Sequence, residues 1–182
     1  SYVQYKTGEI SLDVALEYIH QATALTHNHL RARMASGIYF FMVKSILDEK
    51  GDLLERLQLG IGEAKRFYNS QPINMLEWRH FLRMENLNAF AKVEEKDIRS
   101  SGYVIDSLEA AVWSLITAKS FEEGLLRAVN LGDDTDTVGA IAGGLAALYY
   151  GYNSIPENWR STIIKRDEII NLCMRAQEGF YV

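Results

Sequence analysis

The sequence predicts an all-α fold, and three observations support this prediction. Only two prolines, Pro72 and Pro156, occur in 182 residues, and proline disrupts helix interiors. Apolar residues recur at helical spacing along most of the chain, and we find no segment with the two-residue alternation of a half-buried strand. Residues typical of helix starts and stops separate these segments. We therefore expect several antiparallel or crossed helices in one compact domain.

Three helices are expected in the first 68 residues. Ser11 is placed to cap a helix over residues 12–25. A second helix is expected from about Leu30 to Leu47, ended by the segment 50–52, and a third over residues 53–68. The apolar face of the first helix is expected to contain Val14, Ala15, Tyr18, Ile19 and Ala22. The apolar stripe of the third is expected to contain Leu53, Leu57, Ile61 and Ala64.

The middle of the chain is less regular. Residues 69–101 are predicted to form one helix or two short ones, followed by a polar loop from residue 93 onward. Residues 102–118 contain a further helix, and Ser120 with Glu123 forms a capping box for a helix through Asn130. One face of the helix within 102–118 contains Leu108, Ala111, Val112, Leu115 and Ile116.

Glycines and a proline mark the ends of the remaining helices. Gly132 suits the left-handed position after a helix end. The next helix is expected from near Thr137 to about Tyr150, with Gly151 as its stop. Pro156, between Ser154 and Glu157, is typical of the start of the last helices.

Composition excludes several function classes. The net charge of −5 argues against nucleic acid as a partner, because phosphate-binding surfaces usually carry a basic excess. The single cysteine, Cys173, permits no internal disulfide, which favours a reducing, cytoplasmic location. The longest apolar run, residues 138–150, is too short to span a bilayer, and residues 1–10 do not resemble a signal peptide.

The segment LGDDTDTVGAIAGG, residues 131–144, carries Asp133, Asp134 and Asp136 within four positions. Helix capping and the helix dipole explain one aspartate and one threonine at such a place. Neighbouring carboxylates repel one another, however, and oxygen ligands suit Mg²⁺, Mn²⁺ or Ca²⁺. An EF-hand fits badly, because Leu145 stands where its bidentate glutamate is needed. Capping and a hard-cation site both stay open from the local sequence.

Glycine and alanine cover most faces of the helix that follows the aspartates. Glycine in a helix costs up to about 1 kcal/mol relative to alanine. Close approach of neighbouring helices would offset this cost. We expect this helix to be buried on nearly all sides and to hold the acidic turn rigidly, as a preorganised metal site requires.

Asp134 and Asp136 also imitate the D-x-D-x-T signature of haloacid-dehalogenase-like phosphatases. In that family the first aspartate follows a buried parallel strand. Here the preceding segment, FEEGLLRAVNLG, has the pattern of an amphipathic helix, so this alternative requires a strand that the sequence does not predict.

Several segments together resemble the ADP-ribosylglycohydrolase family, which includes the dinitrogenase reductase-activating glycohydrolases. NLGDDTDTVGAIAGGLAALYYGYNSIPENW resembles the family's C-terminal signature, and three further segments follow the family in order: ALTHNHLRA, SGYVIDSLEAAVWSL and SFEEGLLRAVNLG. The resemblance covers residues from about Asp13 to Trp159. The family fold is a compact all-α domain, which agrees with the helical pattern.

The resemblance implies a dinuclear Mg²⁺ or Mn²⁺ site with Asp134, Asp136 and Thr137 as metal ligands, Asp136 bridging the two ions. It implies a hydrolase that cleaves the N- or O-glycosidic bond between ADP-ribose and a protein side chain or small acceptor. His27 corresponds to a family histidine near the substrate, with backbone hydrogen bonding as its alternative role; His29 is interpreted as structural. Tyr103 would form a wall for the nucleotide, or else be a core aromatic.

Two departures from the family pattern matter. Asp133 stands where the family commonly has glycine. The family's N-terminal section, which carries further metal ligands and a Thr/Ser-Asp-Asp motif, has no counterpart before Leu131. We therefore expect residues 1–182 to be the C-terminal part of a single domain, holding about half of the metal site. Such a chain is expected to be inactive alone and to self-associate or pair with the other section. A non-catalytic, crystallin-like role is the alternative.

Overall fold

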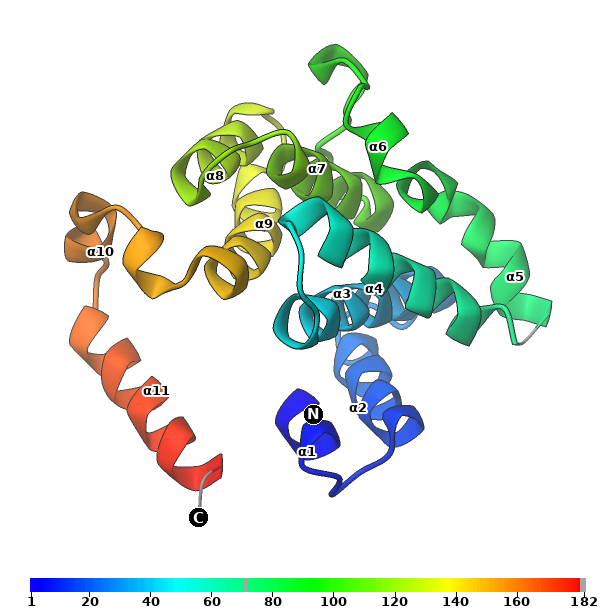
Figure 1. Ribbon diagram of the computed structural model, residues 1–182, viewed down its shortest axis with the longest axis horizontal. Helices are drawn as coiled ribbons and strands as arrows, with labels where there is room; N and C mark the ends of the chain where they lie inside the picture. The colour runs from blue at the N-terminus through cyan, green and yellow to red at the C-terminus, as the bar shows by residue number, and fades with distance from the viewer. Residues whose placement is uncertain (71, 181–182) are drawn as a thin grey trace.

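The all-α prediction is confirmed by the computed structural model, which describes residues 1–70 and 72–180. Over these residues the protein has eleven α-helices and three short 3₁₀ helices, and this part of the chain contains no β-strand. Figure 1 shows the helices in two neighbouring groups with a separate C-terminal helix. No helix among the described residues is both long and apolar enough to cross a membrane.

The first group is built around α3 (Leu30–Asp48). The short helix α1 (Tyr2–Lys6) and α2 (Leu12–Ala24) precede it, and α4 (Leu53–Tyr68) follows it after a short link. Helix α3 contacts α2, α4, α7 and α9, so it lies at the centre of the molecule (Figure 1). The predicted bounds of α2, α3 and α4 are confirmed to within one residue, whereas α1 was not predicted. Every residue of the predicted α4 stripe is buried.

Short helices link the two groups. They are α5 (Pro72–Trp78), the 3₁₀ helix η1 (Arg79–Glu85), α6 (Leu87–Phe90) and the 3₁₀ helix η2 (Glu95–Asp97). Trp78 and Phe81 are buried and join this segment to the main core. The prediction of short helices followed by a polar loop is therefore correct in outline.

The second group consists of α7 (Val104–Ile116), α8 (Phe121–Asn130) and α9 (Thr135–Tyr150), which contact one another. The Ser120 hydroxyl accepts from the Glu123 backbone N–H at 3.1 Å, as the capping box predicts. The Glu123 carboxylate accepts from Lys119 N instead of Ser120 N. Helix α9 begins two residues before its predicted start.

The chain ends with the 3₁₀ helix η3 (Tyr152–Ser154), α10 (Glu157–Thr162) and α11 (Arg166–Phe180). In Figure 1, α11 projects away from both helix groups. Its residues from 167 to 179 are all exposed, including the apolar positions Ile169, Ile170 and Cys173. These apolar positions of α11 therefore face solvent in this chain.

The predicted buried face of α2 is wrong in part. Ala15 is buried and Ile19 half-buried, but Val14, Tyr18 and Ala22 are exposed, and the second fully buried residue is Leu16. Apolar residues cover a wide arc of α2, whereas α3 and α1 cover only one side of it. The helical period of α2 was therefore predicted correctly, whereas the side of the helix that is buried was not.

The helix buried on nearly all sides is α7, not α9. Ten of the thirteen α7 residues are buried, which is typical of a core helix. In α9 only Val138, Ala142, Leu145 and Ala146 are buried, and the face through Thr137 and Ala140 lines a pocket. Small residues there do permit close packing: a Cβ atom on Gly139 would lie 3.1 Å from Val129 Cγ1 of α8.

Candidate functional site

The acidic turn between α8 and α9 is fixed to the segment that precedes α7 by two hydrogen bonds. The Asp134 backbone N–H donates to the Ser100 carbonyl at 3.0 Å, and the buried Ser100 hydroxyl donates to the Gly132 carbonyl at 3.0 Å. Gly132 has a φ of 89°, as predicted, and Asp133 follows with a φ of 53°. Two consecutive left-handed residues reverse the chain and bring Asp134 to the N-terminus of α9.

Capping alone does not account for Asp134. It occupies the N-cap position of α9, but its side chain makes no capping hydrogen bond. Its carboxylate instead lies beside Gly102, where a Cβ atom would come within 3.1 Å of Asp134 Oδ2. Glycine at position 102 therefore leaves room for this carboxylate beside the start of α7.

Asp136 lies in the first turn of α9 and is exposed. A hydrogen bond with Asp134, followed by the backbone N–H groups of Thr137 and Asp136, holds the pKa of the Asp136 carboxyl below its usual value. Neighbouring carboxylates repel one another when both are ionised. A bound cation removes that repulsion.

The donor chemistry of this turn fits a hard divalent cation. Asp134 and Asp136 supply carboxylate oxygens and Thr137 a hydroxyl, which are ligands that Mg²⁺ and Mn²⁺ prefer. Within residues 1–70 and 72–180, no three His, Cys, Asp or Glu side chains converge as a metal-binding group. The turn therefore offers part of a coordination shell, and water or other donors would complete it.

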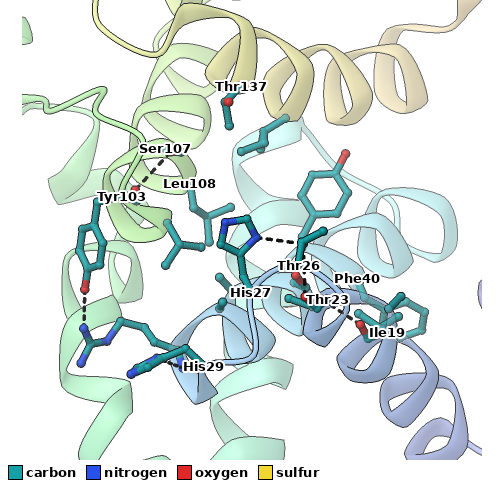
Figure 2. Close-up of a pocket in the computed structure, with 18 of the residues that line it drawn as sticks. Ile19, Thr23, Thr26, His27, His29, Phe40, Tyr103, Ser107, Leu108 and Thr137 are labelled. Atoms are coloured by element: carbon teal, nitrogen blue, oxygen red, sulfur yellow. Dashed lines mark hydrogen bonds between the residues drawn. The ribbon is translucent and has the colours of Figure 1, made fainter.

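A pocket of about 1130 Å³ lies next to this turn, between α2, α3, α7 and α9. This volume is large for a ligand pocket, since such pockets typically measure roughly 300–1,000 Å³. Its lining is mainly apolar and includes no Asp or Glu. His27, Tyr103 and Thr137, predicted from three distant segments, all line it (Figure 2).

His27 and His29 have different environments. The His27 ring is exposed, its Nδ1 lies 2.9 Å from Thr26 Oγ1, and it borders the pocket. Its backbone N–H, not its ring, makes the backbone hydrogen bond, with the Thr23 carbonyl. His29 caps α3, because its Nδ1 accepts from Arg31 N at 3.1 Å. The structural role predicted for His29 is confirmed, and substrate contact by His27 stays a prediction.

Tyr103 is not a core aromatic. It is 43% exposed at the N-cap position of α7. Figure 2 shows its ring at the edge of the pocket, with a hydrogen bond at its hydroxyl end. The donor is Arg31 Nη1, at 2.7 Å. This position is compatible with a wall for a ligand in the pocket.

Sequence reasoning missed Arg31, Ser100 and Gly102. Arg31 belongs to the segment ALTHNHLRA that carries part of the family resemblance, but its contacts with distant segments were not predicted. Ser100 and Gly102 act through contacts with residues more than thirty positions away, and local patterns do not reveal such contacts.

The chain is thus an all-helical domain with an acidic turn beside a large, mainly apolar pocket. The family model for ADP-ribosylglycohydrolase matches residues 5–181, and the chain belongs to this family. An ADP-ribosylarginine hydrolase Tri1 of Serratia proteamaculans is 41% identical over 97 residues, covering 53% of this chain and 26% of that protein. An ADP-ribosyl-[dinitrogen reductase] glycohydrolase of Rhodospirillum rubrum is 37% identical over 65 residues, covering 36% and 22%.

Among solved structures, the chain is similar to an ADP-ribosylglycohydrolase-related protein complex, with a TM-score of 0.68 and 29% identity. The match covers 87% of this chain and 50% of the other. The chain thus spans about a quarter of the length of these curated relatives in its matched segments, and half of the solved chain.

Proposed function

We propose that this chain is part of a metal-dependent hydrolase that cleaves the glycosidic bond between ADP-ribose and an acceptor. The observation that carries the proposal is that Thr137, in the same helix turn as Asp134 and Asp136, lines the pocket together with His27 and Tyr103. Two relatives at 41% and 40% identity are ADP-ribosylarginine hydrolases, so we propose protein-bound arginine as the acceptor.

In this proposal Asp134, Asp136 and Thr137 hold Mg²⁺ or Mn²⁺. When bound, the metal polarises substrate oxygens and lowers the pKa of water. The residues of this chain bind and orient the ligand: the apolar walls exclude water, and Tyr103 forms one side of the pocket. Positioning of this kind lowers the barrier by holding the reacting groups in line.

The phosphatase alternative has no support in the structure. It requires a strand immediately before Asp134, whereas residues 121–130 form α8. We also propose that the metal ligands of this chain are half of the set, because three oxygen donors fill at most half of an octahedral shell. The remaining ligands would come from another section of the protein.

Calorimetric titration with Mn²⁺ tests the metal site. We expect weak binding by the 182-residue chain, and a further loss of about tenfold in Asp136→Asn, because one charged ligand becomes a neutral one. Asp133→Asn is the matched control, since Asp133 belongs to the same turn and is exposed like Asp136 but is not one of the proposed ligands. Equal Mn²⁺ affinities in the parent and Asp136→Asn would contradict the metal assignment.

The activity is tested by the release of ADP-ribose from a protein that is ADP-ribosylated on arginine. The assay is run with this chain and with a version extended to the length of its relatives. We expect turnover by the extended protein with Mn²⁺, and none with a chelator or by the 182-residue chain alone. Robust turnover by the 182-residue chain would contradict the half-site. Metal binding without turnover in the extended protein would favour the non-catalytic role.

A further inference from the structure

Arg31, in the first turn of α3, joins three segments at the edge of the pocket. Its Nε donates to Glu77 Oε2 of α5 at 2.8 Å, and its Nη1 donates to the Tyr103 hydroxyl of α7 at 2.7 Å. Its Nη2 lies 2.9 Å from His80 Nε2 of η1. The side chains of Arg31 and Glu77 are half-buried, so this ion pair is better shielded than one in open solvent.

The chemistry of arginine fixes the direction of these hydrogen bonds. A guanidinium donates only, so His80 Nε2 accepts and His80 is neutral, with its proton on Nδ1. Burial, followed by the positive charge of Arg31, lowers the pKa of His80, which agrees with this state. For the same reason the Tyr103 oxygen accepts from Arg31. The phenolic hydrogen of Tyr103 is then left to donate to another group.

Tyr103 is held at both ends. Its backbone N–H donates to Ser101 Oγ at 3.2 Å, and its carbonyl accepts from the Ser107 backbone N–H at 3.0 Å. Its hydroxyl is held by Arg31. Tyr103 is 43% exposed and does not belong to the buried core, so these polar contacts help to set its orientation. An exposed aromatic ring fixed in this way is preorganised to contact a ligand.

We propose that Arg31 is a positioning residue that presents Tyr103 to the pocket as a hydrogen-bond donor. The ligand atom that faces Tyr103 is then a hydrogen-bond acceptor, such as a ring nitrogen or a sugar or phosphate oxygen of a nucleotide. The identity of the ligand rests on the proposed function, whereas the Arg31–Tyr103 contact does not.

The contact is tested by nuclear magnetic resonance of the 182-residue chain labelled with ¹³C at tyrosine Cζ, with the Tyr103 signal assigned from Tyr103→Phe. We expect Arg31→Met to shift the Tyr103 signal and leave the other tyrosine signals in place. Arg31→Lys is expected to restore the signal in part, because lysine retains the charge but lacks the fork. Arg127→Met is the matched control. Arg127 belongs to α8, where it pairs with Glu123 and lies over the Trp113 ring of α7.

Calorimetric titration with ADP-ribose tests the consequence for the ligand. Arg31→Met and Tyr103→Phe are each expected to weaken ADP-ribose binding about tenfold. The double variant is expected to weaken it by about the same factor, because all three variants lose the same hydrogen bond from the Tyr103 hydroxyl to the ligand. An unchanged Tyr103 signal in Arg31→Met would overturn the contact. Losses that multiply in the double variant would overturn the positioning role. Absence of ADP-ribose binding by the parent chain would reject the proposed ligand. The Arg31–Tyr103 contact would still be tested by the Tyr103 Cζ signal.

Discussion

Asp133 shows how a single residue shapes the candidate site. It follows Gly132 in the left-handed region, and these two residues turn the chain from α8 into α9. The sequence resemblance places glycine at this position in the family, and the positive φ gives the physical reason. Aspartate tolerates this conformation better than most residues, whereas a β-branched side chain does not.

Substitutions at position 133 should therefore separate backbone strain from charge. Asp133→Gly is expected to change the free energy of unfolding by less than about 1 kcal/mol, because relief of strain and of carboxylate repulsion offsets the flexibility of glycine. Asp133→Val is expected to destabilise by about 1–2 kcal/mol. Urea unfolding followed by circular dichroism measures both. A valine variant as stable as the parent would show that the turn relaxes.

The site residues divide by how they could be found from the sequence. Asp134, Asp136 and Thr137 form a compact motif, and local spacing was enough to single them out. Arg31 was not predicted, because its partners Glu77, His80 and Tyr103 lie 46 to 72 positions away in the chain. Packing of α3, α5 and α7 brings these residues together, and local sequence patterns do not show how distant helices pack.

Among the elements, α4 was predicted with both ends correct because its signals are local. Asp52 accepts from Glu55 N at 2.8 Å, and the Glu55 carboxylate accepts from Asp52 N at 3.0 Å, which completes a capping box. Helix α2 has an equally clear cap at Ser11, yet its buried face was misjudged. A cap fixes where a helix begins, whereas the neighbouring helices fix which face is buried.

Two glycines of α4 provide a matched test of helix packing. A Cβ atom on Gly60 would lie 2.6 Å from the Phe41 carbonyl oxygen and 2.9 Å from Met42 Cα, both backbone atoms of α3. On Gly62 the nearest atom within reach is Arg66 Nη1, at 3.9 Å. Of these two glycines, only Gly60 therefore lies at a close approach of α4 to the backbone of α3.

We expect Gly60→Ala to destabilise the protein by about 1–2 kcal/mol, because overpacking outweighs the gain in helix propensity. Gly62→Ala is expected to stabilise it by up to about 1 kcal/mol. Thermal unfolding of the two variants beside the parent measures the difference. Equal melting temperatures for both variants would contradict the close α3–α4 contact.

For the whole molecule, the sequence predicted the helical class and most helix bounds but not where apolar surface would remain uncovered. Val14 and Tyr18 are 39% and 49% exposed, and Leu25, on the same side of α2, is 86% exposed. Helix α11 exposes Ile169, Ile170 and further apolar residues. Contiguous apolar surface of this kind marks interaction sites in folded proteins. The helical period shows that α2 and α11 have apolar residues on one face. Only the structure shows that no other helix covers these residues in the described part of the chain.

The expectation of self-association can be tested on α2. We expect sedimentation velocity to show concentration-dependent association of the 182-residue chain, because pairing of two copies would remove this apolar face from water. Val14→Ser combined with Tyr18→Ser should shift the distribution towards monomer. Leu59→Ser is the matched control, since Leu59 is an exposed leucine on α4. A parent chain that stays monomeric at all concentrations would contradict self-association. Association that survives the α2 substitutions would instead indicate that another exposed apolar set, that of α11 or of α5, supplies the contact.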